Sequence, residues 1–172
     1  PGIRYQPHPA FVNENFSLSR DKIDSLKNPY QLPLGTRELT ADDYIYQIKR
    51  LAHPRLHSPI LGLMSEYIVG LDDFAKQLKN QAKTGWLDLR AIPLKGVERV
   101  DAHTFRVTLN GSYPQFVYWL AMPFFAPMPW EAEKFFEQPG MAEKNFTLDW
   151  WPVGTGAYML TENNPNARMV LE

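Results

Sequence analysis

The glycine-rich segment Val153-Gly154-Thr155-Gly156-Ala157-Tyr158 has the composition of a loop that could cradle a phosphate with its backbone N–H groups. It lacks the Lys-Ser/Thr ending of a P-loop, and no helical sequence follows it. Its two glycines would allow positive φ angles and close approach of another backbone before a strand. The segment therefore favours a structural turn over a phosphate site.

Two pairs of polar residues have the spacing of catalytic or metal-binding groups. His53 and His57 stand at i and i+4, as in a helical zinc pair, but Pro54 lies between them and no acidic third ligand follows. Asp42 and Asp43 could form a carboxylate pair, yet they stand at a helix start, where capping explains them. The sequence therefore predicts no metal site, no catalytic residues and no enzymatic activity.

Several tryptophans could form an aromatic platform for a ligand, namely Trp119, Trp130, Trp150 and Trp151. Large aromatic side chains are usually buried, so we expect most of these four in the core. One of them is expected to face a cleft, and Trp151 is the candidate.

The helix that the sequence marks most clearly spans Ala41–Leu51. Thr40 precedes it as an N-cap, and Asp43 completes a capping-box pattern at the positive end of the helix dipole. Apolar residues recur at helical spacing along one face, and Pro54 ends the pattern. This helix and its neighbours must position any functional group.

Other local patterns predict short helices and strands. Ser58 and Pro59 have the types expected at the cap and first residue of a second helix. Alternating apolar residues predict an antiparallel hairpin, and an Asn-rich turn predicts two C-terminal strands. The expected elements are helices from Ser58 to about 70, over 72–83 and over 130–136, a hairpin of 97–100 with 104–109, and strands over 157–161 and 168–171.

These elements predict an α+β fold, in which helices pack on one side of a small mixed or antiparallel sheet. That sheet is expected to contain both the hairpin and the C-terminal strands. We expect three segments along the chain: a partial strand and irregular insertion over 1–38, a helical and hairpin subdomain over 39–150, and returning strands over 151–172.

Composition narrows the class of protein. The net charge is -1, so no basic excess points to nucleic acid as a partner. There is no cysteine, which excludes disulfides, thiol catalysis and Cys-ligated metals. No apolar run has the length of a membrane span. The first residue is Pro1 and the last is Glu172, and both ends are expected to lie inside a longer protein.

Motifs in a fixed order resemble one known family, the extracellular solute-binding proteins of ABC transporters, in the oligopeptide- and dipeptide-binding group. The resemblance covers about three quarters of the chain and is poor over residues 1–38. The motifs are Leu39-Thr40-Ala41-Asp42-Asp43-Tyr44, Lys49-Arg50-Leu51-Ala52-His53-Pro54, Ser58-Pro59, the segment from Gly96 to Leu109, Pro127-Met128-Pro129, Pro152-Val153-Gly154-Thr155-Gly156-Ala157-Tyr158 and Val170-Leu171-Glu172.

The resemblance implies a substrate-binding component of an ABC importer, located in the periplasm or anchored outside the cytoplasm as a lipoprotein. It would capture a peptide-like solute between two hinged lobes of the type II-like periplasmic binding fold and deliver it to an inner-membrane permease. The chain would be a fragment of the first lobe of a protein about three times as long, and the other lobe would complete the cleft. The resemblance implies no cofactor.

The resemblance also implies candidate ligand contacts. Family members often carry an aromatic residue directly after the Ser-Pro pair, and Ile60 stands there in this sequence. Ile60 can pack on a peptide but cannot donate a hydrogen bond. Gly154, Thr155 and Gly156 would lie where the chain crosses between subdomains, so their N–H groups could meet a ligand carboxylate or carbonyl.

Two other functions stay open at this point. The same fold hosts receptors for non-peptide solutes such as an oligosaccharide, a nickel chelate or haem, and the specificity would lie mostly in the other lobe. Alternatively, the chain could be a stand-alone interaction or regulatory module built on this lobe.

Overall fold

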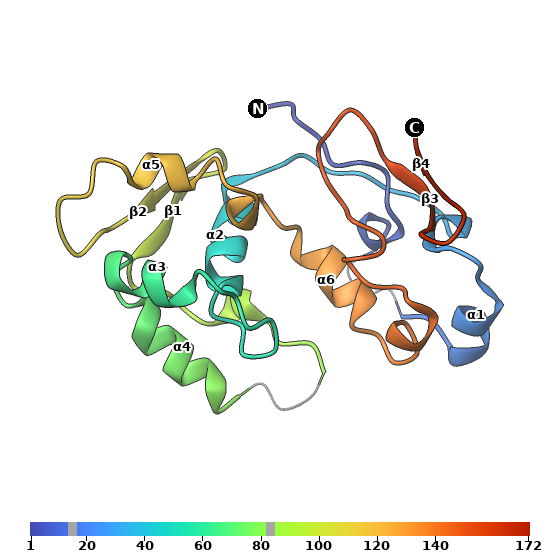
Figure 1. Ribbon diagram of the computed structural model, residues 1–172, viewed down its shortest axis with the longest axis horizontal. Helices are drawn as coiled ribbons and strands as arrows, with labels where there is room; N and C mark the ends of the chain where they lie inside the picture. The colour runs from blue at the N-terminus through green and yellow to red at the C-terminus, as the bar shows by residue number, and fades with distance from the viewer. Residues whose placement is uncertain (14–16, 82–84) are drawn as a thin grey trace. The chain divides into compact units, whose positions relative to one another are not determined.

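The computed structural model describes residues 1–13, 17–81 and 85–172. These residues form two units (Figure 1): unit 1 consists of Pro1–Leu39 and Pro129–Glu172, and unit 2 consists of Thr40–Met128. Unit 1 is therefore built from two stretches of sequence, while unit 2 is continuous. The three-part division expected from the sequence stays a prediction.

Short helices and hairpins account for the regular structure of both units, as expected for an α+β fold. In unit 2 the elements are α2 (Ala41–Arg50), α3 (Leu61–Tyr67), α4 (Leu71–Lys79), η3 (Leu89–Ala91), β1 (Val97–Asp101), β2 (Thr104–Val107), α5 (Phe116–Trp119) and η4 (Pro123–Phe125). In unit 1 they are η1 (Pro9–Phe11), α1 (Arg20–Ser25), η2 (Pro29–Gln31), α6 (Trp130–Phe136), η5 (Ala142–Lys144), β3 (Leu160–Asn164) and β4 (Arg168–Leu171).

The capped helix predicted after Thr40 is confirmed as α2. The carboxylate of Asp43 is only 1% exposed and accepts a hydrogen bond from the backbone N–H of Thr40 at 2.9 Å. Ile45 and Ile48 bury the apolar face, and α2 packs against β1 and β2 (Figure 1). The N-terminal cap and the buried apolar face thus both stabilise α2, as the sequence indicates.

The helix expected to begin at Ser58 and Pro59 begins later, at Leu61. Ile60 is its N-cap, and the carbonyl of Ser58, rather than its hydroxyl, receives the N–H of Leu61 at 3.2 Å. His57, directly before this pair, has a left-handed φ of 47°. The chain therefore makes a turn over Ser58–Ile60 before the helix starts. The next helix, α4, ends at Lys79 instead of Lys83, which lies outside the described residues.

The predicted hairpin is confirmed, with β1 antiparallel to β2 and Val97 opposite Val107. Beyond the hairpin, the N–H of Thr108 bonds the carbonyl of Gly96 at 2.7 Å, and the N–H of Val69 bonds the carbonyl of Thr108. A Cβ atom at Gly96 would stand 2.3 Å from the carbonyl oxygen of Val69. Only glycine fits where these two backbones meet.

The C-terminal strands also form, but they do not join the hairpin. Among the described residues, β3 pairs only with β4 and β1 pairs only with β2, so the hairpin and the C-terminal strands belong to separate two-stranded sheets. The single sheet expected from the sequence is therefore wrong, although the strands themselves are present. Strand β3 begins at Leu160 rather than at Ala157: residues 155–157 bend, and Met159 exchanges hydrogen bonds with Glu172, just beyond β4.

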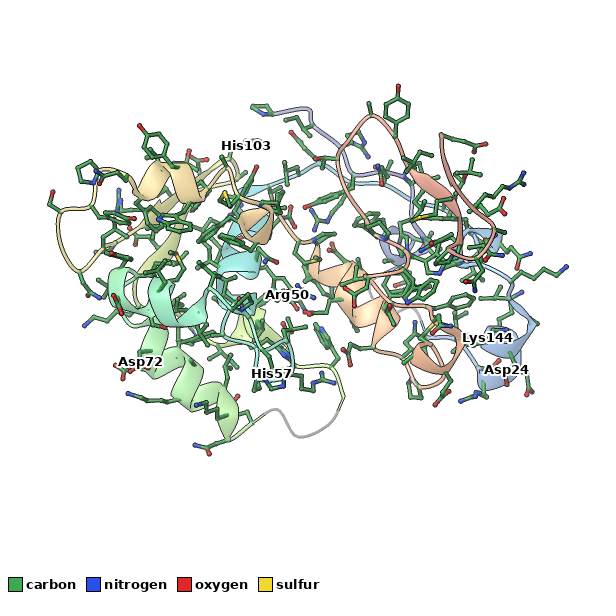
Figure 2. The ribbon with its side chains drawn as sticks, viewed as in Figure 1. Asp24, Arg50, His57, Asp72, His103 and Lys144 are labelled. Atoms are coloured by element: carbon green, nitrogen blue, oxygen red, sulfur yellow. The ribbon has the colours of Figure 1, made fainter. Side chains whose placement is uncertain are left out.

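The core of unit 1 joins its two stretches of sequence. Apolar side chains from both stretches form one cluster: Tyr5, Ala10, Ile23, Leu26, Leu32, Ala132, Phe135, Phe136, Met141, Phe146, Trp151 and Val153. Near the surface, Lys144 donates to the carbonyl of Asp24 at 2.8 Å, and both residues are labelled in Figure 2.

An ion pair also links the two stretches of sequence that form unit 1. Arg37 donates from Nε and Nη2 to the two carboxylate oxygens of Glu131 on α6, at 2.6 and 2.7 Å. The Glu131 side chain is 8% exposed and that of Arg37 is 27% exposed. The Arg37 guanidinium also lies over the ring of Tyr5, 5.2 Å from its centroid. This bidentate geometry suits arginine specifically.

A neutral histidine lies inside the aromatic part of the same core. His8 is 1% exposed, its Nδ1 accepts from the N–H of Ala10 at 3.1 Å, and its ring meets Phe135 edge-on at 5.2 Å. In the described part of the chain, its Nε2 has no hydrogen-bond partner. Burial without a compensating charge lowers the pKa of His8 to about 3.

In the described ranges, no helix combines the length and apolar character needed to cross a bilayer.

Candidate functional site

The glycine-rich segment before β3 lies at the surface of unit 1 beside the N-terminal stretch. Gly154 is half-buried and residues 155–158 are exposed, and the chain bends over 155–157. The N–H of Gln6 bonds the carbonyl of Gly154 at 2.8 Å. The segment is therefore held from one side by the strand-like residues that begin the chain.

Of the backbone donors at residues 154–158, only the first has an acceptor in the described structure. The N–H of Gly154 bonds the Oε1 atom of Gln6 at 3.3 Å. Within the part of the chain that the structure describes, no acceptor is found for the N–H groups of residues 155–158. The exposed donors that the sequence predicts at Thr155 and Gly156 are thus open to solvent, and they could bond a carboxylate or carbonyl of a ligand.

The two glycines do not use the conformational freedom that their residue type allows. Neither Gly154 nor Gly156 has a positive φ. A Cβ atom on either would meet no atom nearer than 4.0 Å. Neither a positive φ nor a close approach by the described residues therefore accounts for the glycines at these two positions.

Trp151 lies in the core of unit 1, three residues before Gly154. It is 7% exposed and meets Tyr30 edge-on, with ring centroids 5.6 Å apart. Trp151, the tryptophan expected to face a cleft, is thus the buried one of the four, while Trp119, Trp130 and Trp150 are half-buried. Ile60 belongs to unit 2, where it is half-buried at the N-cap of α3.

The polar pairs considered from the sequence are separated in unit 2. Asp42 is exposed and pairs with Arg99 at 3.1 Å, while Asp43 is buried and caps α2. His53 is buried and accepts from the N–H of Arg55, whereas His57, labelled in Figure 2, is exposed. Across the described residues, no group of three or more His, Asp or Glu side chains is placed to hold a metal ion.

Sequence reasoning missed the residues that hold the glycine-rich segment and its surroundings. Gln6 lies 148 residues before Gly154, and Arg37 lies 94 residues before Glu131. No local pattern links positions so far apart.

Comparison with known proteins extends these observations. The family model for bacterial extracellular solute-binding proteins, family 5 Middle, matches residues 35–172. The chain belongs to family 5 of the bacterial extracellular solute-binding proteins. The resemblance inferred from the motifs is thereby confirmed, and the match includes the glycine-rich segment and all of unit 2. This family consists of solute-binding components of transport systems.

Curated relatives of this family 5 chain include periplasmic peptide-binding proteins. The periplasmic oligopeptide-binding protein OppA of Salmonella typhimurium is 33% identical over 135 residues, covering 78% of this chain and 22% of the relative. The periplasmic murein peptide-binding protein MppA of Escherichia coli is 28% identical over 136 residues, covering 77% and 22%. The chain thus spans about a fifth of the length of these relatives.

Solved structures share the fold. The unliganded open form of the periplasmic murein tripeptide-binding protein MppA matches 78% of this chain and 23% of that one, with a TM-score of 0.55 at 26% identity. The pheromone receptor PrgZ matches 74% of this chain and 22% of that one, with a TM-score of 0.53 at 22% identity. The expected α+β fold, a lobe of a peptide-binding protein of this type, is confirmed.

Proposed function

We propose that this chain is part of the substrate-binding component of an ABC importer and helps to capture peptide-like solutes outside the cytoplasm. Membership of family 5 carries the proposal, together with relatives whose names describe oligopeptide and murein peptide binding. The location would be the periplasm, or the outer face of the membrane through a lipid anchor. The partner would be an inner-membrane ABC permease.

In this proposal the whole protein binds without chemistry. A solute would enter an open cleft, and closure would add the contacts of a second lobe, so that the liganded state is selected by its extra binding energy. No residue acts as a catalyst, and no cofactor takes part. This chain, about a fifth of its relatives' length, would supply only some of the contacts.

The contacts proposed in this chain centre on the glycine-rich segment. Open N–H groups at Thr155 and Gly156 would donate to a carbonyl or carboxylate of the peptide, and the half-exposed Gly154 would leave room for its backbone. Trp151 would support this segment from the core rather than meet the solute itself, and Ile60 would offer an apolar contact from unit 2. We also keep as a proposal the division of the chain into segments 1–38, 39–150 and 151–172.

Peptide binding is expected to depend on the rest of the protein. The 172-residue chain alone should bind tri-alanine weakly or not at all, because it would supply only some of the contacts, whereas the whole protein should bind it with micromolar affinity or better. Calorimetry on both measures the difference. Micromolar binding by the 172-residue chain would contradict the divided cleft. Binding of maltotriose, a nickel chelate or haem in place of tri-alanine would assign a different solute.

A substitution at Gly156 tests whether this residue contributes to peptide binding rather than to stability. Gly156→Ala fits the space and the backbone of the structure, so the free energy of unfolding should change by less than about 1 kcal/mol. If a peptide backbone approaches this position, the added methyl group should weaken tri-alanine binding by the whole protein at least about tenfold. Gly111→Ala, at an open and exposed glycine of unit 2, is the matched control. Equal affinities for the two variants would remove Gly156 from the site.

A further inference from the structure

The side chain of Gln6 lies at the centre of the bend in the glycine-rich segment. Its Oε1 atom accepts from the N–H of Gly154 at 3.3 Å, and its Nε2 atom donates to the carbonyl of Gly156 at 3.5 Å and to the carbonyl of Tyr158. One side-chain amide thus bonds three backbone groups over five residues. The backbone N–H of Gln6 adds a fourth bond, to the carbonyl of Gly154.

These bonds fix which way the amide points. Two backbone carbonyls require a donor, and one backbone N–H requires an acceptor, so only one orientation of the Gln6 amide satisfies all three groups. No other side-chain type presents a donor and an acceptor in this arrangement at this reach. Gln6 and the glycine-rich segment both belong to unit 1, but they lie on its two separate stretches of sequence.

The bonds also fix where the free donors point. Because carbonyls of Gly156 and Tyr158 turn inward to Gln6, the chain between them bends, and the N–H groups of residues 155–158 are left without an acceptor in the described structure. Without Gln6, a segment with two unhindered glycines would sample many conformations. A ligand would then have to order the segment before bonding to it.

We propose that Gln6 is a positioning residue, which holds residues 154–158 in the bend that presents their N–H groups to a solute; this role rests on the solute-binding function proposed above. Gln6 does not touch the solute. It acts through the backbone of the glycine-rich segment and lowers the cost of ordering that segment when the solute binds.

The substitution Gln6→Glu tests this role with almost no change of shape. Glutamate keeps an oxygen for the N–H of Gly154 but places a second, charged oxygen against the carbonyls of Gly156 and Tyr158. Gln31→Glu adds the same charge at an exposed position of unit 1, where the oxygen that accepts from Lys27 is kept. It is the matched control.

The first measurement follows the segment in the 172-residue chain by NMR. At pH 7, Gln6→Glu should lower the backbone order parameters of residues 155–158 from about 0.85 to below about 0.6, while Gln31→Glu leaves them unchanged. Lowering the pH to about 4, near the usual pKa of glutamate, should restore order in part, because the introduced carboxyl group can donate again once it is protonated. Unchanged order in Gln6→Glu at pH 7 would overturn the proposal.

The second measurement uses the whole protein and tri-alanine. Gln6→Glu should weaken tri-alanine binding at least about tenfold at pH 7. The urea midpoint of unfolding should be the same for Gln6→Glu and Gln31→Glu. Lost order with unchanged affinity would overturn the positioning role. A wild-type protein that binds no peptide would overturn the proposed function instead, and the NMR result would still decide whether Gln6 sets the bend.

Discussion

Replacing Arg37 by Met is expected to lower the free energy of unfolding of unit 1 by about 3 kcal/mol. The substitution removes both hydrogen bonds to Glu131 and leaves a carboxylate that is 8% exposed without its cation. Breaking a buried pair on one side costs about 3–5 kcal/mol, and Arg37 is still 27% exposed, which places the effect at the lower end. Urea denaturation followed by tryptophan fluorescence measures the change.

Two further variants test the cause of this loss. Arg37→Lys should be intermediate, because an ammonium cannot make the two parallel bonds that the guanidinium makes. Arg20→Met breaks exposed pairs with Asp24 and Glu143 in the same unit, where all three side chains are at least half exposed, and should cost clearly less than Arg37→Met. If Arg37→Met costs no more than Arg20→Met, the pair with Glu131 contributes little to the junction.

Acidification is expected to destabilise unit 1 through His8. An unfolded histidine has a pKa near 6.5, while burial holds the pKa of His8 at about 3 in the folded chain. Below pH 6.5 the unfolded chain therefore binds a proton that the folded chain does not, and stability falls by up to about 1.4 kcal/mol per pH unit. The full contribution is present above pH 6.5, and it is lost as the pH falls toward 3. Between pH 7 and pH 4, His8 should account for about 3 kcal/mol.

Variants without an imidazole isolate this contribution from the carboxylates that titrate in the same range. His8→Asn keeps an acceptor for the N–H of Ala10, and His8→Phe keeps a ring among Phe11, Tyr30, Phe135 and Phe136. Between pH 7 and pH 4, the free energy of unfolding of each variant should fall by less than that of the wild type. The difference from the wild type should be the same for both variants, although their free energies of unfolding at pH 7 differ. NMR should find the His8 ring neutral at pH 4 in the wild type. A ring that is protonated at pH 5 would contradict the burial argument.

Local signals in the sequence predicted the elements that local interactions make. Helix α2 has its cap, its acidic first turn and its apolar stripe within eleven residues, and α6 matches the predicted range of 130–136. The hairpin was also predictable, because alternation and a tight turn at Asp101-Ala102-His103 lie side by side in the sequence. Motifs distributed over the chain were enough to identify the family, since their order is specific even where each one is short.

The errors concern backbone geometry and distant contacts. Ser58 and Pro59 have the right types for a helix start, but the left-handed residue before them directs the chain into a turn first. The glycines at 154 and 156 would allow positive φ but do not have it, and the segment is instead hydrogen-bonded by Gln6, which no local pattern connects to them. Likewise, the sequence does not reveal that the hairpin and the C-terminal strands occupy different units, because strand pairing over long separations leaves no periodic signal.

The discontinuity of unit 1 has a consequence for biosynthesis. During translation, residues 1–39 leave the ribosome before unit 2, but α6 and the strands that complete their core follow only after residue 128. At about 5–20 residues per second, unit 2 takes roughly 4–18 seconds to emerge. The nascent N-terminal stretch must therefore wait with Tyr5, Ile23 and Leu26 unshielded, and unit 2, whose sequence is continuous, can complete its folding first.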